Sequence, residues 1–416
     1  MISHYILAAA GWLLVVAFVF GGFERRILLR LWCEPVMRCP VLIIESDDWG
    51  PGPPEDAEAL QHLIEVLSRH RDGQGRRVVM TLGMLLSVPD GQEIRRTEEQ
   101  EYYAALLSEP RFASILAAIQ RGVEEGVFSP QLHGMEHYWP AAVMKASRER
   151  EDVHAWLVQD GVPRSEDLPA ELQSRWIDAS VLPSRELPAG EVAVAAIHEV
   201  EAFGRVFGAK PAVVVPPTFV WTDQSEAAWS SAGMRVVVTP GVRYVRRDGE
   251  AKLIGDDERV YNGEIGVSGM IYVVRDDYFE PALGHRAGRA VAAMEAKIRV
   301  GRPTLLETHR FNFTGSSAQT DDALRETELL LRSVVERFPG VRFISTAELA
   351  SAMSRADPDL VERSFALRIR AWLARLARIP RLRKLAWLSG AIVPAWLIYQ
   401  SLSFIGKRSA PDAGVA

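Results

Sequence analysis

The sequence predicts an α/β fold, a parallel barrel that is closed or nearly closed, and three observations lead to it. Short apolar runs rich in β-branched residues alternate with helical patterns along most of the chain. The 416 residues, 48% hydrophobic and 25% charged, suffice for one large core with appendages. Acidic and His residues directly follow several apolar runs, as catalytic residues of α/β barrels follow their strands.

Each expected strand is short and mostly apolar. We expect strands at Val41–Glu45, Val78–Leu82, Ser129–His133, Ala212–Pro216, Arg235–Val238, Met270–Val274, Pro303–Thr308 and Val341–Ser345. We expect helices at Asp56–Ser68, Arg111–Glu125, Pro140–Leu157, Glu191–Phe207, Gln224–Gly233, His285–Val300 and Thr320–Phe338. The Pro-, Glu- and Ser-rich stretch 160–190 is predicted to cross the barrel rim, and 246–264 to form a hairpin or exposed loop.

Two adjacent carboxylates, Asp47 and Asp48, lie just past the first predicted strand and are followed by a stiff Trp-Gly-Pro-Gly turn. Adjacent carboxylates after a strand often only cap a helix or a loop, so the pair alone is weak evidence. In a metal site, one carboxylate could bind a divalent ion and its neighbour could take a proton from a water molecule on that ion.

Two imidazoles lie four residues apart: His133 ends the third predicted strand and His137 follows it, with Glu136 between them. Histidines at this spacing can simply share one face of a helix, but the flanking residues favour a strand that passes into a loop. Asp plus two His is a common ligand set for a zinc-like ion, and it leaves positions open for water and substrate.

A third segment ends another apolar strand at His309, which is followed by Arg310 and Asn312 as hydrogen-bond donors. A His at the end of a barrel strand can serve as the general acid for a leaving group. The alternative is a His whose hydrogen bonds are satisfied by backbone within the rim.

The three segments together resemble the polysaccharide deacetylase (NodB-homology) superfamily, which includes chitin and peptidoglycan deacetylases. Its motifs have the forms Thr-Phe-Asp-Asp, His-Ser/Thr-x-x-x-His and Leu-x-His. The resemblance implies a distorted (β/α)7 barrel. It also implies Asp47 as catalytic base, His309 as acid, and Asp48, His133 and His137 as ligands of a divalent metal, with Zn²⁺ expected.

The chain departs from the superfamily at two motifs. The Arg-x-Pro motif should fall near residues 215–221, which contain no Arg. Because that Arg normally orients the base, Arg310 or Arg243 is expected to replace it. Asp223 is the candidate for the Asp-x-x-Asp-Trp motif, and Trp221 could form a floor on which a sugar stacks or could belong to the core.

Further residues beside the motifs are expected to support the metal ligands or to contact substrate. These residues are Glu136, Arg310, Asn312 and Trp221.

Both ends of the chain are predicted to be membrane-associated. Residues 1–30 contain an uncharged run long enough for a transmembrane anchor, and residues 385–405 form a second hydrophobic, transmembrane segment. Between the predicted barrel domain, residues 40–356, and that second segment, residues 363–384 interleave Arg with Leu, Ile and Trp. This pattern predicts a basic amphipathic helix on a membrane surface.

Charge is distributed unevenly along the chain. The formal net charge is −6, yet Arg363–Arg408 holds ten Lys or Arg and no Asp or Glu. The acidic main domain argues against nucleic acid as a partner, and the basic tail points to anionic membrane lipid. Arg25, Arg26 and Arg30 follow the first apolar run. By the positive-inside rule, they predict a bacterial-type cell membrane protein with its main domain on the cytoplasmic side.

The sequence thus predicts a metal-dependent hydrolase that removes an acyl group from an amino sugar of a glycan or a lipid-linked saccharide. A non-catalytic, saccharide-binding barrel in a membrane glycan-assembly complex is the alternative, favoured by the missing Arg-x-Pro motif. A glycosidase is a third reading. It would need two carboxylates that flank the sugar, and the candidates are Glu45, Glu136 and Glu307.

Overall fold

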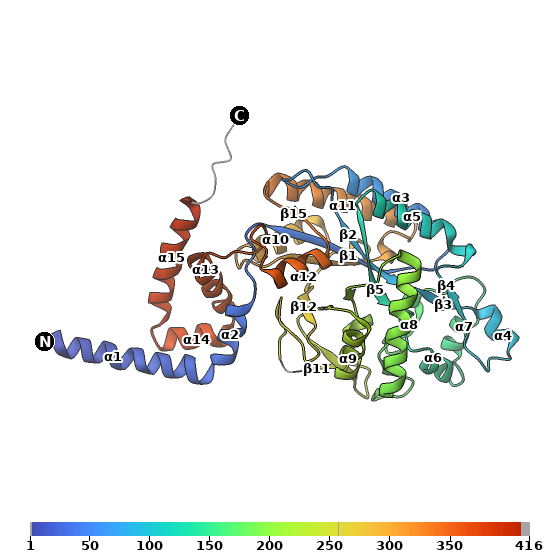
Figure 1. The fold of residues 1–416 in the computed structure, drawn as a ribbon, viewed down its shortest axis with the longest axis horizontal. Helices are drawn as coiled ribbons and strands as arrows, with labels where there is room; N and C mark the ends of the chain where they lie inside the picture. The colour runs from blue at the N-terminus through green and yellow to red at the C-terminus, as the bar shows by residue number, and fades with distance from the viewer. Residues whose placement is uncertain (1, 257, 409–416) are drawn as a thin grey trace. The chain divides into compact units, whose positions relative to one another are not determined.

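The computed structural model describes residues 2–256 and 258–408, which form two compact units (Figure 1). The larger unit comprises Cys39–Met294 and Pro303–Ser351 and contains the strands of the central sheet. The smaller unit gathers the two ends of the chain with the short stretch Glu295–Arg302, and we call it the helical unit.

The larger unit is built on one curled, parallel sheet of nine strands. The strands are β1 (Val41–Trp49), β2 (Met80–Leu85), β5 (Phe128–Gly134), β8 (Val213–Val214), β9 (Val236–Thr239), β12 (Ile271–Val274), β13 (Asp277–Tyr278), β14 (Thr304–His309) and β15 (Arg342–Phe343). Their order is β12-β9-β8-β5-β2-β1-β14-β13, with β15 paired to β1. The edge strands β12 and β13 come from one stretch of chain, so the sheet is barrel-like, as the alternating sequence pattern predicts.

Helices cover the sheet because each crossover between parallel strands needs a long connection. The principal ones are α3 (Glu55–Ser68), α5 (Ala113–Glu124), α8 (Ala189–Phe207), α9 (Asp223–Ala232), α10 (Ala287–Ile298), α11 (Ser317–Arg337) and α12 (Thr346–Arg355). Strand β1 is buried at every position, as expected for a strand covered on both faces. All eight predicted strands are present, although β8 and β15 have only two residues each.

One predicted helix, Pro140–Leu157, is instead two helices, α6 (Pro140–Ser147) and α7 (Glu151–Leu157). The break lets side chains from both helices, including Val143 and Trp156, pack into one buried cluster. Tertiary packing has therefore overridden a continuous helical pattern.

Smaller elements decorate the larger unit. They are α4 (Gly91–Arg96) and the antiparallel pairs β3 (Ser87–Pro89) with β4 (Ala104–Leu106), β6 (Ile177–Asp178) with β7 (Arg185–Glu186), and β10 (Tyr244–Arg247) with β11 (Leu253–Gly255). The last pair is the hairpin expected near residues 246–264.

The helical unit consists of α1 (Ile2–Phe18), a π-helical turn, α2 (Arg25–Cys33), α13 (Phe365–Leu376), α14 (Pro380–Leu388) and α15 (Ile392–Arg408). Arg375 of α13 is buried at its centre and donates hydrogen bonds to the backbone carbonyls of Leu31, Glu34, Pro35, Val300 and Gly301. One guanidinium thereby ties together three separate stretches of the unit.

The predicted single transmembrane helices at residues 1–30 and 385–405 are not supported. Within 2–256 and 258–408, no single helix is both long and apolar enough to cross a membrane, and residue 1 lies outside the described part. By length and composition, only the pair Pro380–Leu388 and Ile392–Ser403, bent by 112°, could cross one. The bend follows from Gly390, whose φ of 73° is a left-handed conformation that ends α14.

Candidate active site

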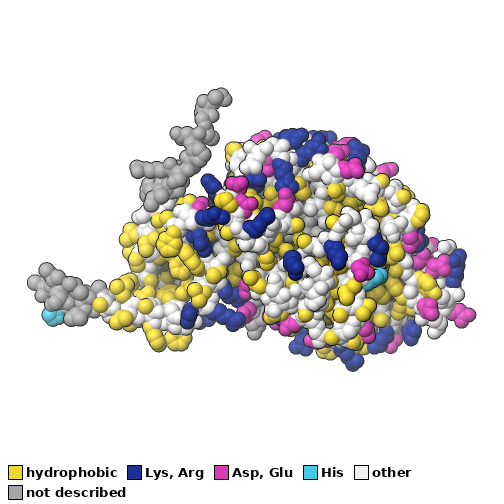
Figure 2. All heavy atoms as spheres, viewed as in Figure 1, with side chains coloured by type: hydrophobic (Ala, Val, Ile, Leu, Met, Phe, Trp, Pro, Cys, Tyr) yellow, Lys and Arg dark blue, Asp and Glu magenta, His cyan; other side chains and the backbone are white. Residues whose placement is uncertain are grey.

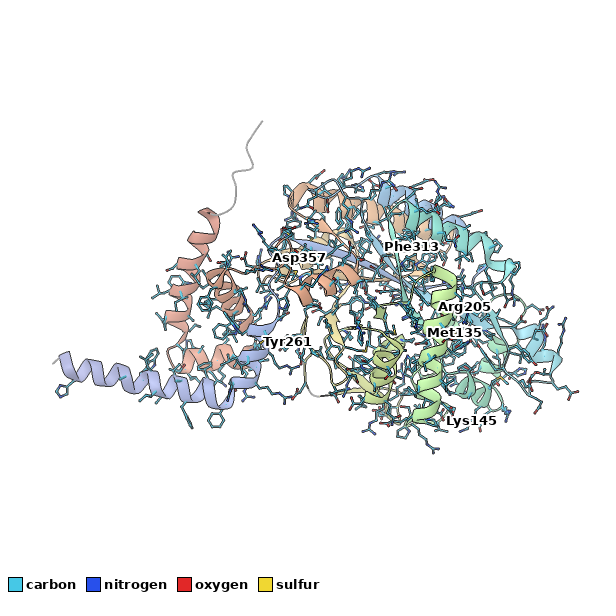
Figure 3. All side chains as sticks on the ribbon, in the orientation of Figure 1. Met135, Lys145, Arg205, Tyr261, Phe313 and Asp357 are labelled. Carbon is cyan, nitrogen blue, oxygen red and sulfur yellow. The ribbon has the colours of Figure 1, made fainter. Side chains whose placement is uncertain are left out.

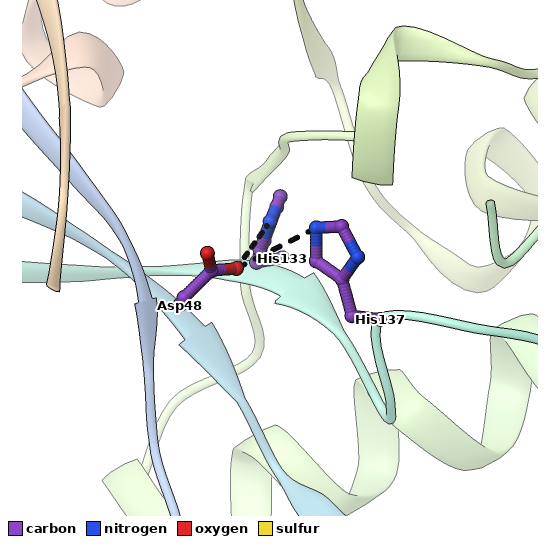
Figure 4. Close-up of side chains that lie close together, drawn as sticks. All are labelled: Asp48, His133 and His137. Carbon is purple, nitrogen blue, oxygen red and sulfur yellow. Dashed lines mark ion pairs between the residues drawn. The ribbon is translucent and has the colours of Figure 1, made fainter. Parts of the chain in front are cut away.

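Three buried side chains, Asp48, His133 and His137, converge at the carboxyl ends of β1 and β5 (Figure 4). The Nε2 atoms of His133 and His137 lie 3.3 and 3.5 Å from the same carboxylate oxygen, Oδ1 of Asp48. One potential ligand atom from each residue lies within 4.8 Å of the others. The structure therefore brings together the three residues that the sequence predicts as metal ligands.

The donor atoms of this group fit a divalent cation. Oδ1 of Asp48 and Nε2 of His133 are buried and have no hydrogen-bond partner among the described residues, and a buried polar atom without a partner is costly. Nδ1 of His133 contacts the carbonyl of Val215 at 2.8 Å, an arrangement that turns Nε2 toward the group. A cation bound by these atoms would satisfy them.

Electrostatics also favour metal-binding protonation states at two of the three residues. Burial, together with His133 and His309, lowers the pKa of His137 to about 4 although Asp48 raises it. Although burial alone would raise the pKa of Asp48, the two neighbouring His side chains hold it below its usual value. Neutral imidazole and ionised carboxylate are the forms that bind metals.

The backbone at this edge of the sheet is strained. Asp48 has a φ of 69°, where β1 shifts its register against β2. Thr218 and Phe219, in the turn after β8, also have positive φ values, 53° and 55°. Non-Gly residues in the left-handed region cost free energy and cluster at functional sites, so the strain marks this edge as a candidate site.

Asp47, the predicted base, is held by Arg275, which lies in the link between β12 and β13. Nη2 of Arg275 lies 2.6 Å from Oδ2 of Asp47, and both side chains are buried. Oδ1 of Asp47 has no hydrogen-bond partner among the described residues. It faces Gly83 of β2, where a Cβ atom would lie 2.3 Å from it, so only Gly leaves room.

Arg275 is shared by two further carboxylates: its Nη1 lies 2.8 Å from Oε2 of Glu45, and its Nε 3.3 Å from Oε2 of Glu307. Burial raises the pKa of Glu45 and of Glu307 in spite of Arg275. Burial would also raise the pKa of Asp47, but Arg275 and His133 hold it below its usual value. Of the three carboxylates around Arg275, Asp47 is therefore the one whose pKa is shifted in favour of the ionised form.

The expectation that Arg310 or Arg243 orients the base is wrong. Arg310 pairs with Asp56 and Glu166 at 3.6 and 3.1 Å, and Arg243 pairs with Asp223 and Asp256. The buried Asp56 of α3 and the partly exposed Glu166 of the rim segment both pair with Arg310, so this Arg fastens the rim segment 160–190 to the start of α3.

His309, the predicted acid, lies opposite Asp47 in the register of β14 and β1. Its Nδ1 contacts Oε1 of Glu280 at 2.6 Å. Burial would lower the pKa of His309, but the hydrogen bond to Glu280 and the charges of Asp48, Glu280 and Asp47 raise it to about 10. Asn312 donates a hydrogen bond to Glu280 and thereby supports the residue that holds His309. His309 is thus kept protonated.

The loop between His133 and His137 is held in place by an Arg from the rim segment. Arg175, from the rim segment, donates to Glu136 at 2.5 Å and to Glu199 of α8 at 3.0 Å. Glu136 also accepts a hydrogen bond from the hydroxyl of Ser87 at 2.8 Å. Glu199 accepts one from the backbone N–H of Met135, a residue labelled in Figure 3. Glu136 therefore supports the loop and is turned away from solvent.

Trp221 does not form a sugar platform. It is completely buried, its Nε1 contacts Glu226, and its ring packs edge-on against Tyr272. Trp221 is a core residue.

Arg275 and Glu280 were absent from the sequence prediction. Both follow the strand predicted at Met270–Val274, in a run of charged residues at the same edge of the sheet as Asp47. The rule that a charged residue directly after a strand is a site candidate, which indicated Asp47, would also have indicated Arg275 but not Glu280.

A buried Asp-His-His group beside a carboxylate held by Arg and a His held by Glu is the kind of side-chain set that metal-assisted hydrolases use. No family model and no curated protein matches the chain. Solved structures that match include several polysaccharide deacetylases, the family that the motifs resemble.

Three matching structures illustrate the range of the likeness. A 4-alpha-glucanotransferase from Thermococcus litoralis is 10% identical with a TM-score of 0.41; the match covers 76% of this chain but only 40% of that protein. The peptidoglycan deacetylase PdaC from Bacillus subtilis is 11% identical with a TM-score of 0.36, over 77% and 94% of the two chains. A family 4 carbohydrate esterase from Streptomyces lividans, in complex with acetate, is 10% identical with a TM-score of 0.34, over 74% and 92%. At these values, function has to be argued from the site itself.

Proposed function

We propose that the protein is a metal-dependent carbohydrate deacylase that removes an acyl group, acetyl in the simplest case, from an amino sugar of a glycan or a lipid-linked saccharide. The observation that carries the proposal is the buried group of Asp48, His133 and His137, directly beside Asp47. Within this group, Oδ1 of Asp48 and Nε2 of His133 have no hydrogen-bond partner among the described residues. The curled sheet is then a divergent form of the superfamily's (β/α)7 barrel.

Asp48, His133 and His137 would hold the ion, and two His with one carboxylate favour Zn²⁺. When bound, the ion would polarise the acyl carbonyl and lower the pKa of a water molecule. Every other step is assigned to side chains of this chain.

Asp47 accepts the proton of the attacking water. Arg275 keeps it ionised and occupies Oδ2, which leaves Oδ1 as the atom for the proton. The water oxygen forms a bond to the acyl carbon as its proton passes to Asp47, and a general base within reach of that water supports this step.

His309 gives its proton to the departing nitrogen. The C–N bond of the amide breaks, the amine takes the proton from His309, and the products are a carboxylic acid and the free amino sugar. Glu280 supports this role because it holds the imidazole protonated before the bond breaks. The proton that Asp47 has gained restores His309 at the end of the cycle.

The alternative of a non-catalytic saccharide-binding barrel was favoured by the missing Arg-x-Pro motif. That reason disappears because Arg275 reaches Asp47 from a different segment of the chain. A glycosidase gains no support from Glu45, which is completely buried and held by Arg275 and Thr346.

Membrane lipid, as partner and as location of the substrate, belongs to the same proposal. Its support is the composition of α13 and α14, in which Arg alternates with apolar side chains. We also propose that the larger unit lies on the cytoplasmic side of the membrane. Arg25, Arg26 and Arg30 follow the first apolar run, and the positive-inside rule places such residues in the cytoplasm.

The test is acid release from N-acetylated amino-sugar oligosaccharides by the full-length protein, followed by detection of acetate and of the new amine. Asp47→Asn and His309→Gln are each expected to lower kcat by about a hundredfold or more. Arg243→Ala is the matched control. Release that is absent from the metal-loaded wild type, or unchanged in both variants, would contradict the proposal.

A further inference from the structure

The helical unit exposes an unusual amount of apolar surface. In Figure 2, hydrophobic side chains cover much of its visible face, whereas charged and polar groups intersperse them on the larger unit. Its exposed large side chains include Trp12, Leu14, Phe18, Trp387, Leu388 and Trp396, between 38% and 72% exposed. Soluble proteins rarely expose contiguous patches of this kind without a binding partner.

A groove of about 600 Å³ opens within this unit. Its walls are apolar side chains of α1, α13, α14 and α15 and of the turn before α2, among them Val16, Phe20, Trp372, Leu376, Ala386 and Trp396. The volume is in the range of small-molecule sites, and walls of this composition match hydrocarbon.

Cationic side chains also border the groove. Arg299, Arg378 and Arg383 contribute to its lining, and none of the described lining residues is acidic. Arg378 donates to the carbonyl of Ala296 at 2.7 Å, and burial and the nearby Arg302 and Arg299 lower its pKa. Like charges gathered at one place favour an anion between them.

We propose that this groove binds one anionic lipid, with a hydrocarbon chain against Trp372 and Trp396 and the phosphate of the headgroup at Arg378 and Arg383. Apolar walls and guanidinium groups in one groove match the two parts of such a molecule. The site lies in the helical unit and goes beyond the proposed deacylation, because it depends on no residue of the candidate metal centre.

The test is native mass spectrometry of the full-length protein in a non-ionic detergent, with phosphatidylglycerol as the probe and phosphatidylcholine for comparison. We expect one phosphatidylglycerol per chain, retained in preference to phosphatidylcholine. Arg378→Glu/Arg383→Glu is expected to weaken this binding by about tenfold or more, since each basic residue near an anionic headgroup contributes to affinity. Lys384→Glu, next to Arg383 but outside the lining, is the matched control and should have a much smaller effect.

A second variant tests the hydrocarbon part. Ala386→Phe/Ala395→Phe fills the groove and should abolish retention of phosphatidylglycerol without changing charge. If circular dichroism shows that this variant does not fold, the Arg378→Glu/Arg383→Glu variant, which changes only exposed side chains, still tests the proposal. Equal retention of both lipids, equal effects of Lys384→Glu and the double Arg variant, or a lipid-free dimer that covers the groove would each overturn the proposal.

Discussion

Nη2 of Arg275 lies 2.6 Å from Oδ2 of Asp47, although 228 residues separate the two in the chain. The contact joins the end of β1 to the link between β12 and β13, where the two edges of the curled sheet come from one stretch of chain. It places the positive charge that keeps Asp47 ionised in a region with no sequence motif.

Replacement of Arg275 by Met should therefore lower activity and stability together. Three buried carboxylates lose their cation, and breaking such a buried pair costs about 3–5 kcal/mol. With Arg275→Lys, which retains a charge but cannot contact three carboxylates through three separate nitrogens, the pKa of Asp47 should rise. Because the base must be ionised, the acid limb of the kcat/KM profile should move to higher pH.

The pH profile of kcat/KM and urea unfolding measure these effects. Arg243→Lys, which pairs with Asp223 and Asp256 away from Asp47, should leave the acid limb in place. If the acid limb of the kcat/KM profile stays in place in Arg275→Lys, Arg275 does not control the pKa of Asp47.

Glu280→Gln should shift the alkaline limb of the pH profile of kcat/KM. Glu280 raises the pKa of His309, so the neutral amide should lower it from about 10. His309 must carry its proton to release the amine, and it would lose that proton at a lower pH. We therefore expect kcat/KM of the variant to decline at a lower alkaline pH than that of the wild type. NMR titration of His309 measures the change in its pKa directly. An identical limb in both proteins would remove His309 as the acid.

The ion pairs of Arg175 with Glu136 and Glu199, which hold the loop between His133 and His137, predict a pH dependence of stability. Burial raises the pKa of Glu199 from 4.5 to about 7 although Arg175 lowers it. Because the folded value is above the unfolded one, the stability contributed by Glu199 is complete below pH 4.5. It is lost as pH rises through about 7, at a cost of about 3 kcal/mol.

Glu199→Gln should abolish the loss of stability with rising pH, because the glutamine does not ionise but can still accept a hydrogen bond from Arg175. Urea unfolding on the acid and alkaline sides of pH 7 compares the two proteins. Glu201→Gln, an exposed position on the same helix, is the control and should behave as the wild type does. A wild-type stability that is flat across this pH window would contradict the assignment.

Arg375→Met should loosen the helical unit. Arg375 satisfies five backbone carbonyls and lies 3.4 Å from Glu34, so its loss should cost about 3 kcal/mol or more. Hydrogen exchange should rise in α2 and α13 and remain unchanged in β1 and β14. Arg370→Met on the same helix is the control. Equal exchange in both variants would show that α13 is held by its apolar face alone.

The sequence predicted most of what local patterns determine. The existence of β1 and β5 and the metal-ligand candidates at their carboxyl ends followed from apolar runs and from the residues after them, although β1 continues to Trp49, beyond its predicted end at Glu45. The split between α6 and α7 did not follow in this way, because it depends on how side chains pack in three dimensions. Local periodicity reports which face is apolar, but it does not report what that face packs against.

Ion pairing at the site was the least predictable part. Arg310 stands next to His309 in the chain and was expected to hold the base, whereas the fold directs it to Asp56 and Glu166. Arg275 reaches Asp47 only because the curled sheet brings the link after β12 close to β1. Partners separated by hundreds of residues leave no spacing signal in one sequence.

The most direct test of the central claim is the metal content of the purified full-length protein, measured by elemental analysis beside His133→Ala/His137→Ala. We predict close to one zinc, or a similar divalent ion, per wild-type chain and its loss in the double variant, with the fold retained by circular dichroism. A wild type that stays metal-free after reconstitution with zinc, cobalt, nickel or manganese would contradict the proposed chemistry.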